Sequence, residues 1–125
     1  MKITSFNPQI FTTDMEPVIK LFEGLGFERR HKTEGIGALD VTGVRMVSGD
    51  GFALDISQNG VLTHGDMVGI RMNVDNFEEA YQLLTGRGFR NVYGSNHIEM
   101  PDRKSAILVS PTGFGINLVE HIKKR

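Results

Sequence analysis

Residues 47–56 read VSGDGFALDI and residues 109–118 read VSPTGFGINL, so one pattern occurs twice in the chain. The two stretches are 62 positions apart (109 − 47) and align without a gap. In each, a Ser-x-x-Gly turn leads into residues that alternate between apolar and small or polar, as in a hairpin that closes on a half-buried strand. The chain is therefore built from two repeats, each ending in this turn and strand.

The repeat extends upstream, because Gly-Leu-Gly-Phe at 24–27 returns as Gly-Arg-Gly-Phe at 86–89, again 62 positions later. A period of about 60 residues is too long for a solenoid and indicates two copies of one larger module. Each copy predicts a β-α-β-β-β order, in which the first helix is capped by Asp14 and the second by Asn76. The expected strands are 5–13, 27–34, 38–47 and 51–57, then 67–74, 90–96, 104–110 and 113–121, with the second helix at 77–86. The expected organisation is one α+β domain over 1–125, made of module 1 (about 1–60) and module 2 (about 65–125).

Apolar periodicity predicts which faces are buried. Side chains at helical spacing should pack on the sheets, and so should one set of alternating residues in the opening and closing strands. The expected helix positions are Val18, Leu21, Phe22 and Leu25, then Phe77, Ala80, Tyr81 and Leu84. The expected strand positions are Phe52, Leu54 and Ile56, matched by Phe114, Ile116 and Leu118, together with Val68, Ile70, Met72 and Val74.

The opposite faces of the same strands are small and polar, which suits the concave lining of a ligand site. Alternation alone predicts that this lining contains Asn7, Gln9, Phe11, Asp55, Ser57, Arg71, Asn73 and Asn117. A bulge in any strand would shift its residues to the other face.

Composition excludes several classes of function. The chain has 14 basic and 15 acidic residues, so no basic surface for nucleic acid is expected. It has no cysteine, which removes disulfides, thiolate catalysis and cysteine metal sites. No apolar run approaches 18 residues and the start lacks a signal peptide, so neither membrane insertion nor export is expected and the cytoplasm is the predicted location.

With these features, the chain resembles the vicinal oxygen chelate superfamily, which includes glyoxalase I, the bleomycin and fosfomycin resistance proteins and the extradiol dioxygenases. The resemblance rests on the paired modules, on Leu25-Gly26-Phe27 and Arg87-Gly88-Phe89 at the helix ends, and on the closing hairpin at 110–120. It implies cup-shaped mixed sheets and a homodimer. It implies little about activity, because one fold hosts many chemistries.

Metal enzymes of this superfamily take a ligand from the first and last strand of each module. Carried onto this sequence, those four positions are Asn7, Asp55, Gly69 and Asn117. Such sites favour imidazole and carboxylate ligands together, whereas this set holds one carboxylate, two amides and a glycine. A register two residues further along would bring Gln9 and Arg71 to the opening positions, and arginine is no better a ligand. The expectation is a chain without a metal or another cofactor.

Each polar position has a functional and a structural interpretation. Asp55 and Arg71 could form a salt bridge with each other, or Arg71 could hold a carboxylate while Asp55 takes a cationic or hydroxyl group. Asp55 could also act as a general base, although no acid partner is evident. Phe11 could form an aromatic wall or fill the core. His97 could hydrogen-bond a ligand or transfer a proton, or it could be an exposed loop residue.

Two classes of function remain. The favoured hypothesis is a non-catalytic binding protein, similar to the drug-sequestering members, that holds an organic small molecule, for example an antibiotic-like one, in a β-cup of a homodimer. The alternative is a metal-dependent lyase or isomerase of the glyoxalase type, or a dioxygenase. A weaker third hypothesis is a metal-free enzyme that uses Asp55 or His97.

Overall fold

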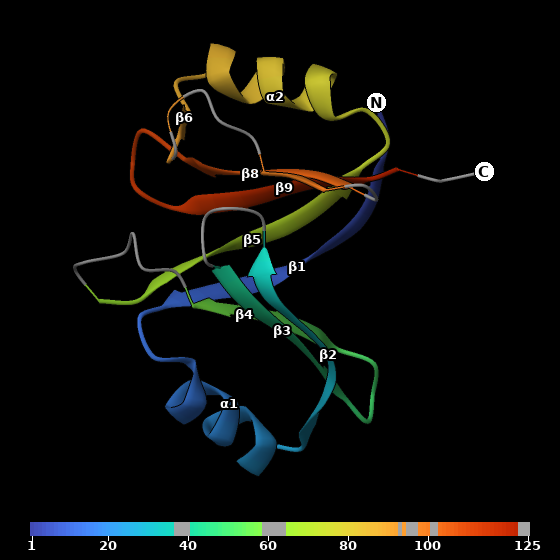
Figure 1. Ribbon diagram of the computed structural model, residues 1–125, viewed down its shortest axis with the longest axis vertical. Coiled ribbons are helices and arrows are strands. Elements are labelled where there is room, and N and C mark those ends of the chain that lie inside the picture. The colour runs from blue at the N-terminus through green and yellow to red at the C-terminus, as the bar shows by residue number, and fades with distance from the viewer. Residues whose placement is uncertain (37–40, 59–64, 93, 95–97, 101–102, 123–125) are drawn as a thin grey trace. The chain divides into compact units, whose positions relative to one another are not determined.

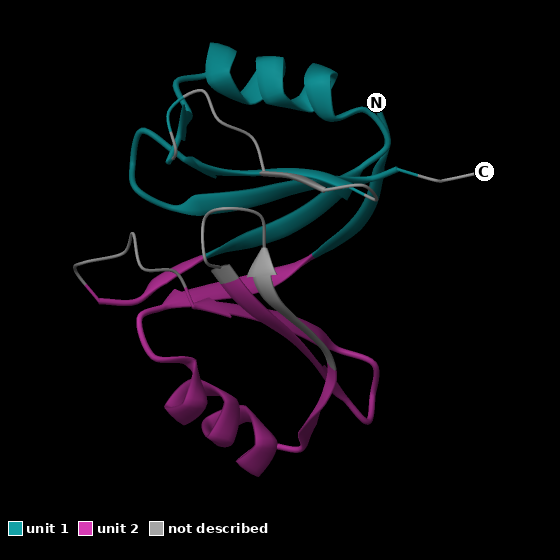
Figure 2. Ribbon diagram, viewed as in Figure 1, with its two compact units in different colours: residues 1–6, 69–125 teal, residues 7–68 magenta. Residues whose placement is uncertain are grey.

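The computed structural model of the chain describes residues 1–36, 41–58, 65–92, 94, 98–100 and 103–122. They form two compact units: unit 2 comprises residues 7–68, and unit 1 comprises residues 1–6 with 69–125 (Figure 2). The first six residues therefore belong with the second half of the chain. The backbone of Lys2 explains this, because its N–H donates to Asp75 Oδ1 at 2.6 Å and its carbonyl accepts from the Asp75 N–H at 3.0 Å.

Unit 2 combines one helix with a mixed sheet (Figure 1). Its strands are ordered β2-β3-β4-β1, in which β3 runs antiparallel to both of its neighbours and β4 runs parallel to β1. The elements are β1 (Ile3–Thr12, which begins in unit 1), α1 (Met15–Gly24), β2 (Phe27–Ile36), β3 (Val41–Ser48) and β4 (Ala53–Gln58).

Unit 1 repeats this plan with strand order β5-β9-β8-β6, in which β5 and β9 are parallel, and adds a short strand β7 that pairs with β8. Its elements are β5 (Met67–Val74), α2 (Phe77–Gly86), β6 (Arg90–Asn91), β7 (Ile98–Met100), β8 (Arg103–Val109) and β9 (Gly115–His121). The strand expected over 90–96 is wrong in extent, because the chain turns at Asn91, whose carbonyl accepts the Gly94 N–H at 3.1 Å. The predicted α+β class with tandem βαβββ modules is confirmed.

In each unit the helix covers one face of the sheet (Figure 1). The buried apolar side chains of the helix and the sheet pack together in one cluster per unit. In unit 2 these are Met15, Ile19, Val44, Met46, Leu54 and Ile56. In unit 1 they are Met72, Val74, Phe77, Ala80, Leu84, Ala106, Leu108, Ile116 and Leu118. The predicted inward face of the second helix is confirmed, with Tyr81 partly buried against this core.

The predicted face of the first helix is wrong in part. Leu21 and Leu25 are 58% and 65% exposed, while the buried contacts come from Met15 and Ile19. The buried side thus begins at the first helical residue, one turn earlier than the apolar residues of the sequence indicate. Phe52 is also exposed, because β4 begins only at Ala53.

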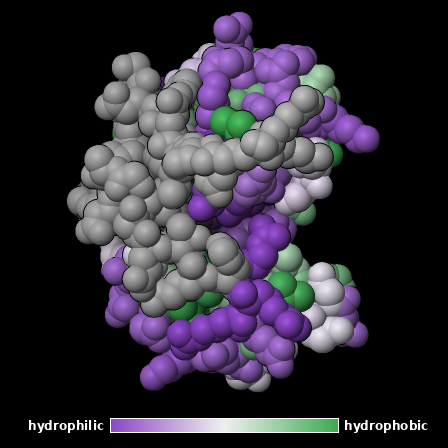
Figure 3. Space-filling model, turned by 45° about the vertical axis from the view of Figure 1, so that its right-hand side comes forward, coloured by the Kyte–Doolittle hydropathy of each residue, from purple (hydrophilic) through white to green (hydrophobic). Residues whose placement is uncertain are grey.

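Exposed apolar side chains occur in both units. Besides Leu21 and Leu25, three residues of the predicted buried set are exposed: Phe52, Val68 and Phe114 are 68%, 64% and 43% exposed. On the face of the molecule seen in Figure 3, most of the described surface is hydrophilic and the apolar residues form small separate patches. Scattered exposed apolar side chains are normal in proteins and do not by themselves mark an interface.

The closing hairpins of the two units have matching geometry, as the repeat predicts. The Ser48 N–H donates to the Phe52 carbonyl at 2.9 Å, and the Ser110 N–H donates to the Phe114 carbonyl at 2.8 Å. The side chains of both serines also accept from the backbone within the turn. These turns set the strand register, since a hairpin's register follows from its turn. In unit 2 that register places Arg45 opposite Asp55.

The helices begin in the same way in both units. The Met15 N–H donates to Gln58 Oε1 at 2.9 Å, and the Phe77 N–H donates to Glu120 Oε1 at 2.7 Å. Gln58 and Glu120 are themselves 62 positions apart, so each closing strand ends on a side chain that binds the start of its own helix. Asp14 occupies the predicted N-cap position of α1, but its side chain makes no capping hydrogen bond. The predicted capping interaction of Asp14 is therefore wrong.

The glycines that follow the helices give a matched stability test. Gly26 and Gly88 have φ angles of 101° and 93°, which L side chains rarely adopt. We expect Gly26→Ala to cost about 1–2 kcal/mol from this strain alone. Gly88→Ala should cost about 1 kcal/mol more, because its Cβ would lie 2.9 Å from Pro111 Cγ, whereas nothing lies within 4 Å at position 26. Urea denaturation of both variants measures the difference, and equal losses would contradict the packing argument.

Candidate functional site

In unit 2, the sheet face opposite α1 carries a set of buried polar side chains. The parallel pairing of β1 and β4 puts Gln9 beside Asp55 and Phe11 beside Ser57. Leu54 and Ile56 pack under the helix, so alternation turns Asp55 and Ser57 to the other side. Every residue predicted for this half of the lining is at least 90% buried: Asn7, Gln9, Phe11, Asp55 and Ser57.

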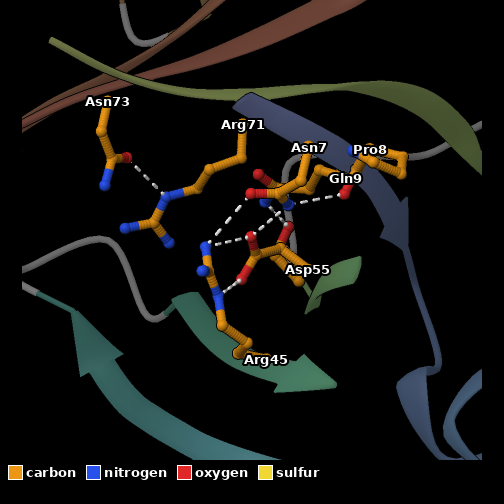
Figure 4. Close-up of polar contacts among 8 residues, drawn as sticks. Asn7, Pro8, Gln9, Arg45, Asp55, Arg71 and Asn73 are labelled. Carbon is orange, nitrogen blue, oxygen red and sulfur yellow. Dashed lines mark hydrogen bonds and ion pairs between the residues drawn. The ribbon is translucent and has the colours of Figure 1, made fainter. Parts of the chain in front are cut away.

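Asp55 lies at the centre of this surface and is bound by an arginine. Arg45, on β3, donates from Nε to Asp55 Oδ1 at 3.2 Å and from Nη2 to Oδ2 at 2.7 Å (Figure 4). This two-point contact is the strong arrangement of an arginine–carboxylate pair. The side chain of Asp55 is 7% exposed and that of Arg45 is 30% exposed. Solvent therefore reaches part of the Arg45 side chain but almost none of the Asp55 side chain.

Asn7 completes the cluster. Its Nδ2 donates to Asp55 Oδ2 at 2.6 Å and to the Pro8 carbonyl at 3.0 Å, while its Oδ1 accepts from Arg45 Nη2 at 3.3 Å (Figure 4). The amide thus bridges both charged groups and fixes their geometry. We name Asn7, Arg45 and Asp55 the ion-pair cluster.

Two further lining residues interact next to the ion-pair cluster. Gln9 donates from Nε2 to Ser57 Oγ at 3.0 Å, so a second buried polar contact links β1 to β4. Phe11 is 1% exposed and is not one of the side chains that pack under α1. Its burial fits either interpretation of this residue, as an aromatic wall or as filling.

The corresponding face of unit 1 has different chemistry. Arg71 lies on β5 with Asn117 as its neighbour on β9, and its Nε donates to Asn73 Oδ1 at 3.2 Å (Figure 4). All three side chains are half-buried. The structure therefore brings these three predicted residues together within unit 1. His97 lies outside the described residues.

The Asp55 carboxylate binds Arg45, a residue absent from the predicted lining. Strand parity could have found it. Val44 and Met46 are apolar and pack under the helix, so Arg45 must face the other way. The Ser48-Gly49-Asp50-Gly51 turn then sets Arg45 opposite Asp55.

The side chains do not fit the metal site that the superfamily resemblance implies. Asp55 is the one anionic group among the four ligand positions, and both of its oxygens bind Arg45. Asn7 offers amide atoms that are already hydrogen-bonded, and Gly69 has no side chain. Among the described residues, no group of three or more His, Asp or Glu side chains is arranged to hold a metal ion. The guanidinium of Arg45 supplies the positive charge beside Asp55.

No helix within the described ranges combines the length and the apolar character that a bilayer-spanning helix needs. Comparison of the sequence with protein-family models and with curated proteins gives no match. The fold does match solved structures.

A glyoxalase/bleomycin resistance protein/dioxygenase superfamily member from Vibrio splendidus 12B01 is 17% identical, with a TM-score of 0.60 over 97% of this chain and 100% of that one. A hypothetical protein from Bacillus halodurans C-125 is 15% identical, with a TM-score of 0.64 over 98% and 99%. Methylmalonyl-CoA epimerase from Mycobacterium tuberculosis is 16% identical, with a TM-score of 0.64 over 94% and 88%. At these identities the likeness concerns the fold.

Proposed function

We propose that this chain, which has the fold of the vicinal oxygen chelate superfamily, binds an organic small molecule without a metal ion. The observation that carries the proposal is the Arg45–Asp55 ion pair, because it occupies the one anionic ligand position with a resident cation. A metal-dependent lyase, isomerase or dioxygenase needs that carboxylate for its ion. An arginine that binds it at two points competes with any such role.

The buried polar face supports a binding role. Burying polar side chains on this face costs more free energy than burying apolar ones. Even a well-paired buried ion pair adds little net stability. The buried polar residues are Asn7, Gln9, Asp55 and Ser57. Retaining such groups is expected where they orient a ligand. Arg45 is partly exposed, and its Nη1 makes no hydrogen bond with the described residues, so this edge can donate to a ligand oxygen.

In this proposal the protein does no chemistry on its ligand. The ion-pair cluster offers no ready general base, because both oxygens of Asp55 accept hydrogen bonds from Arg45 or Asn7. Its contribution is a fixed set of polar groups, of which Arg45 is the partly exposed member. The homodimer, the cytoplasmic location and an antibiotic-like ligand belong to the same proposal.

Metal content tests the proposal directly. The protein is purified without chelator, then dialysed against zinc, nickel, manganese and iron, and analysed by inductively coupled plasma mass spectrometry. We expect far less than one metal ion per chain in every sample, because the single carboxylate is engaged. About one ion per chain that is lost in Asp55→Ala would overturn the proposal in favour of the metal-dependent alternative.

A thermal-shift screen of antibiotics and aromatic acids forms the second arm of this test. A compound that raises the melting temperature should do so by mass action, to the same extent with and without chelator. A rise that requires added metal would again favour the alternative. Ser57→Ala and Thr85→Ala form a matched pair of variants, since Ser57 lies in the polar face and Thr85 is exposed on α2. Only the first should change the affinity for the compound.

A further inference from the structure

The sheet of unit 1 carries positive charge on its face opposite α2. Met72 and Leu118 pack under the helix, so Arg71 on β5 and Asn117 on β9 point to the other side. Ala106 and Leu108 of β8 lie in the core, at even-numbered positions. By the same alternation Arg103, at an odd-numbered position of this strand, faces the other side. Arg90 on β6 follows, as the partner of Val109. Among the described residues of β5, β6, β8 and β9, no Asp or Glu side chain lies on this face.

The two units differ at matching positions of their sheets. Asp55 of unit 2 corresponds to Asn117 of unit 1, and Arg45 corresponds to Ile107, each 62 positions on. In unit 2 the strand pair β3–β4 therefore holds a cation and its carboxylate together. In unit 1 the carboxylate is replaced by an amide, and the arginine lies instead on β5 beside that amide. The two units share a backbone pattern, but this face carries an arginine–carboxylate pair in unit 2 and an arginine beside an amide in unit 1.

Arg71 is held in a defined orientation within unit 1. Its Nε donates to Asn73 Oδ1 at 3.2 Å, which leaves the plane of the guanidinium fixed relative to β5. The neighbour of Arg71 on β9 is Asn117, and both side chains are half-buried. An oriented guanidinium beside an amide suits an organic acid, whose planar carboxylate an arginine binds with two parallel hydrogen bonds.

We propose that this face of unit 1 binds the carboxylate of a small organic acid, with Arg71 as the contacting residue, Asn117 as a second donor and Asn73 as the positioning residue. The inference rests on the proposed function and deepens it, because it assigns the ligand a chemical class. Arg90 and Arg103 lie further along the face and add to the attraction for an anion without contacting it.

The test uses matched pairs of probes that differ only in charge: benzoate with benzamide, and succinate with succinamide. Binding is followed on the full chain by ¹H–¹⁵N correlation spectra that include the arginine Nε–H signals. We expect saturable shifts of the Arg71 Nε signal with at least one acid, and at least about tenfold weaker binding of its amide counterpart, because the charge-assisted bonds are lost. The affinity for the acid should fall with added salt.

Variants separate contact from structure. Arg71→Lys should weaken binding of the acid about tenfold, because a lysine keeps the charge and loses the two-point geometry. Asn73→Ala should weaken binding less and broaden the Arg71 Nε signal, since the guanidinium is no longer held. Arg87→Ala removes an exposed arginine at the end of α2 and should leave the affinity unchanged.

Three results would count against the inference in distinguishable ways. If Arg71→Ala lowers the melting temperature while the probes bind it and the wild type equally, Arg71 is an ion-pair partner within the fold. If acids and amides bind equally well, the ligand class is wrong although the binding function holds. If no probe gives a saturable shift and stoichiometric metal is found, the proposed function itself fails.

Discussion

Replacing Arg45 with methionine is expected to lower the free energy of unfolding by about 3–5 kcal/mol, the cost of removing one partner from a buried ion pair. The methionine keeps much of the volume of the arginine stem, so the loss is electrostatic. Asp55 would lose both of its contacts to the guanidinium and stay 95% buried. Urea denaturation followed by circular dichroism measures the change, since the chain has no tryptophan.

The control is an arginine of the same unit that lies at the surface. Arg29 forms ion pairs with Glu16 and Glu23 at 3.5 and 3.2 Å, but its side chain is 41% exposed. Arg29→Met should therefore cost far less stability than Arg45→Met, because exposed ion pairs contribute little. Similar losses in the two variants would mean that burial does not decide the energy of the Arg45 pair.

The double variant Arg45→Met/Asp55→Leu separates stability from function. Replacing both members of a buried pair by apolar residues is often neutral or stabilising, so most of the loss should be recovered. If the ion-pair cluster serves only the fold, this variant should bind ligands as the wild type does. We expect a stable protein that no longer responds to compounds found in the thermal-shift screen, because the fixed donors and acceptors are gone.

The fold could be predicted from the sequence because the repeat aligns without a gap. A constant offset of 62 residues carries the turns, helix ends and alternating strands of one module onto the other, so each element is indicated twice. The least reliable part was the first helix. Its buried side begins at Met15, whose N–H binds Gln58, a residue 43 positions away that local patterns cannot connect to it.

The sheet face on which these polar side chains lie could be predicted from the sequence, whereas their contacts could be predicted only in part. Alternation correctly turned Asn7, Gln9, Asp55 and Ser57 away from the helix, because period-two geometry holds in any regular strand. It did not identify which groups bind each other. The residue opposite Asp55 in its own hairpin is Arg45, which the predicted lining does not contain. Cross-strand partners within a hairpin follow from the turn, so the sequence indicates this neighbour more directly than any residue of the other module.

Shortening a buried side chain in the core of unit 1 should lower stability more than shortening an exposed side chain. Phe77 is fully buried, packs against Tyr81 with ring centroids 5.7 Å apart, and lies at the start of α2. Phe77→Ala should lower the free energy of unfolding by about 3–5 kcal/mol, because the removed ring leaves a cavity that the surrounding side chains fill only partly. The backbone contact to Glu120 is retained, since it uses the Phe77 N–H.

Two variants show whether that loss comes from packing. Met15 occupies the same position of α1 in unit 2 and is 6% exposed, so Met15→Ala should cost about 2–5 kcal/mol. Leu83 is 47% exposed on α2, and Leu83→Ala should stay within about 0.5 kcal/mol of the wild type. If Phe77→Ala costs no more than Leu83→Ala, α2 is not held to its sheet by this side chain. The helix contact at Glu120 would then have to hold the start of α2 in place, and Glu120→Ala would become the more damaging substitution.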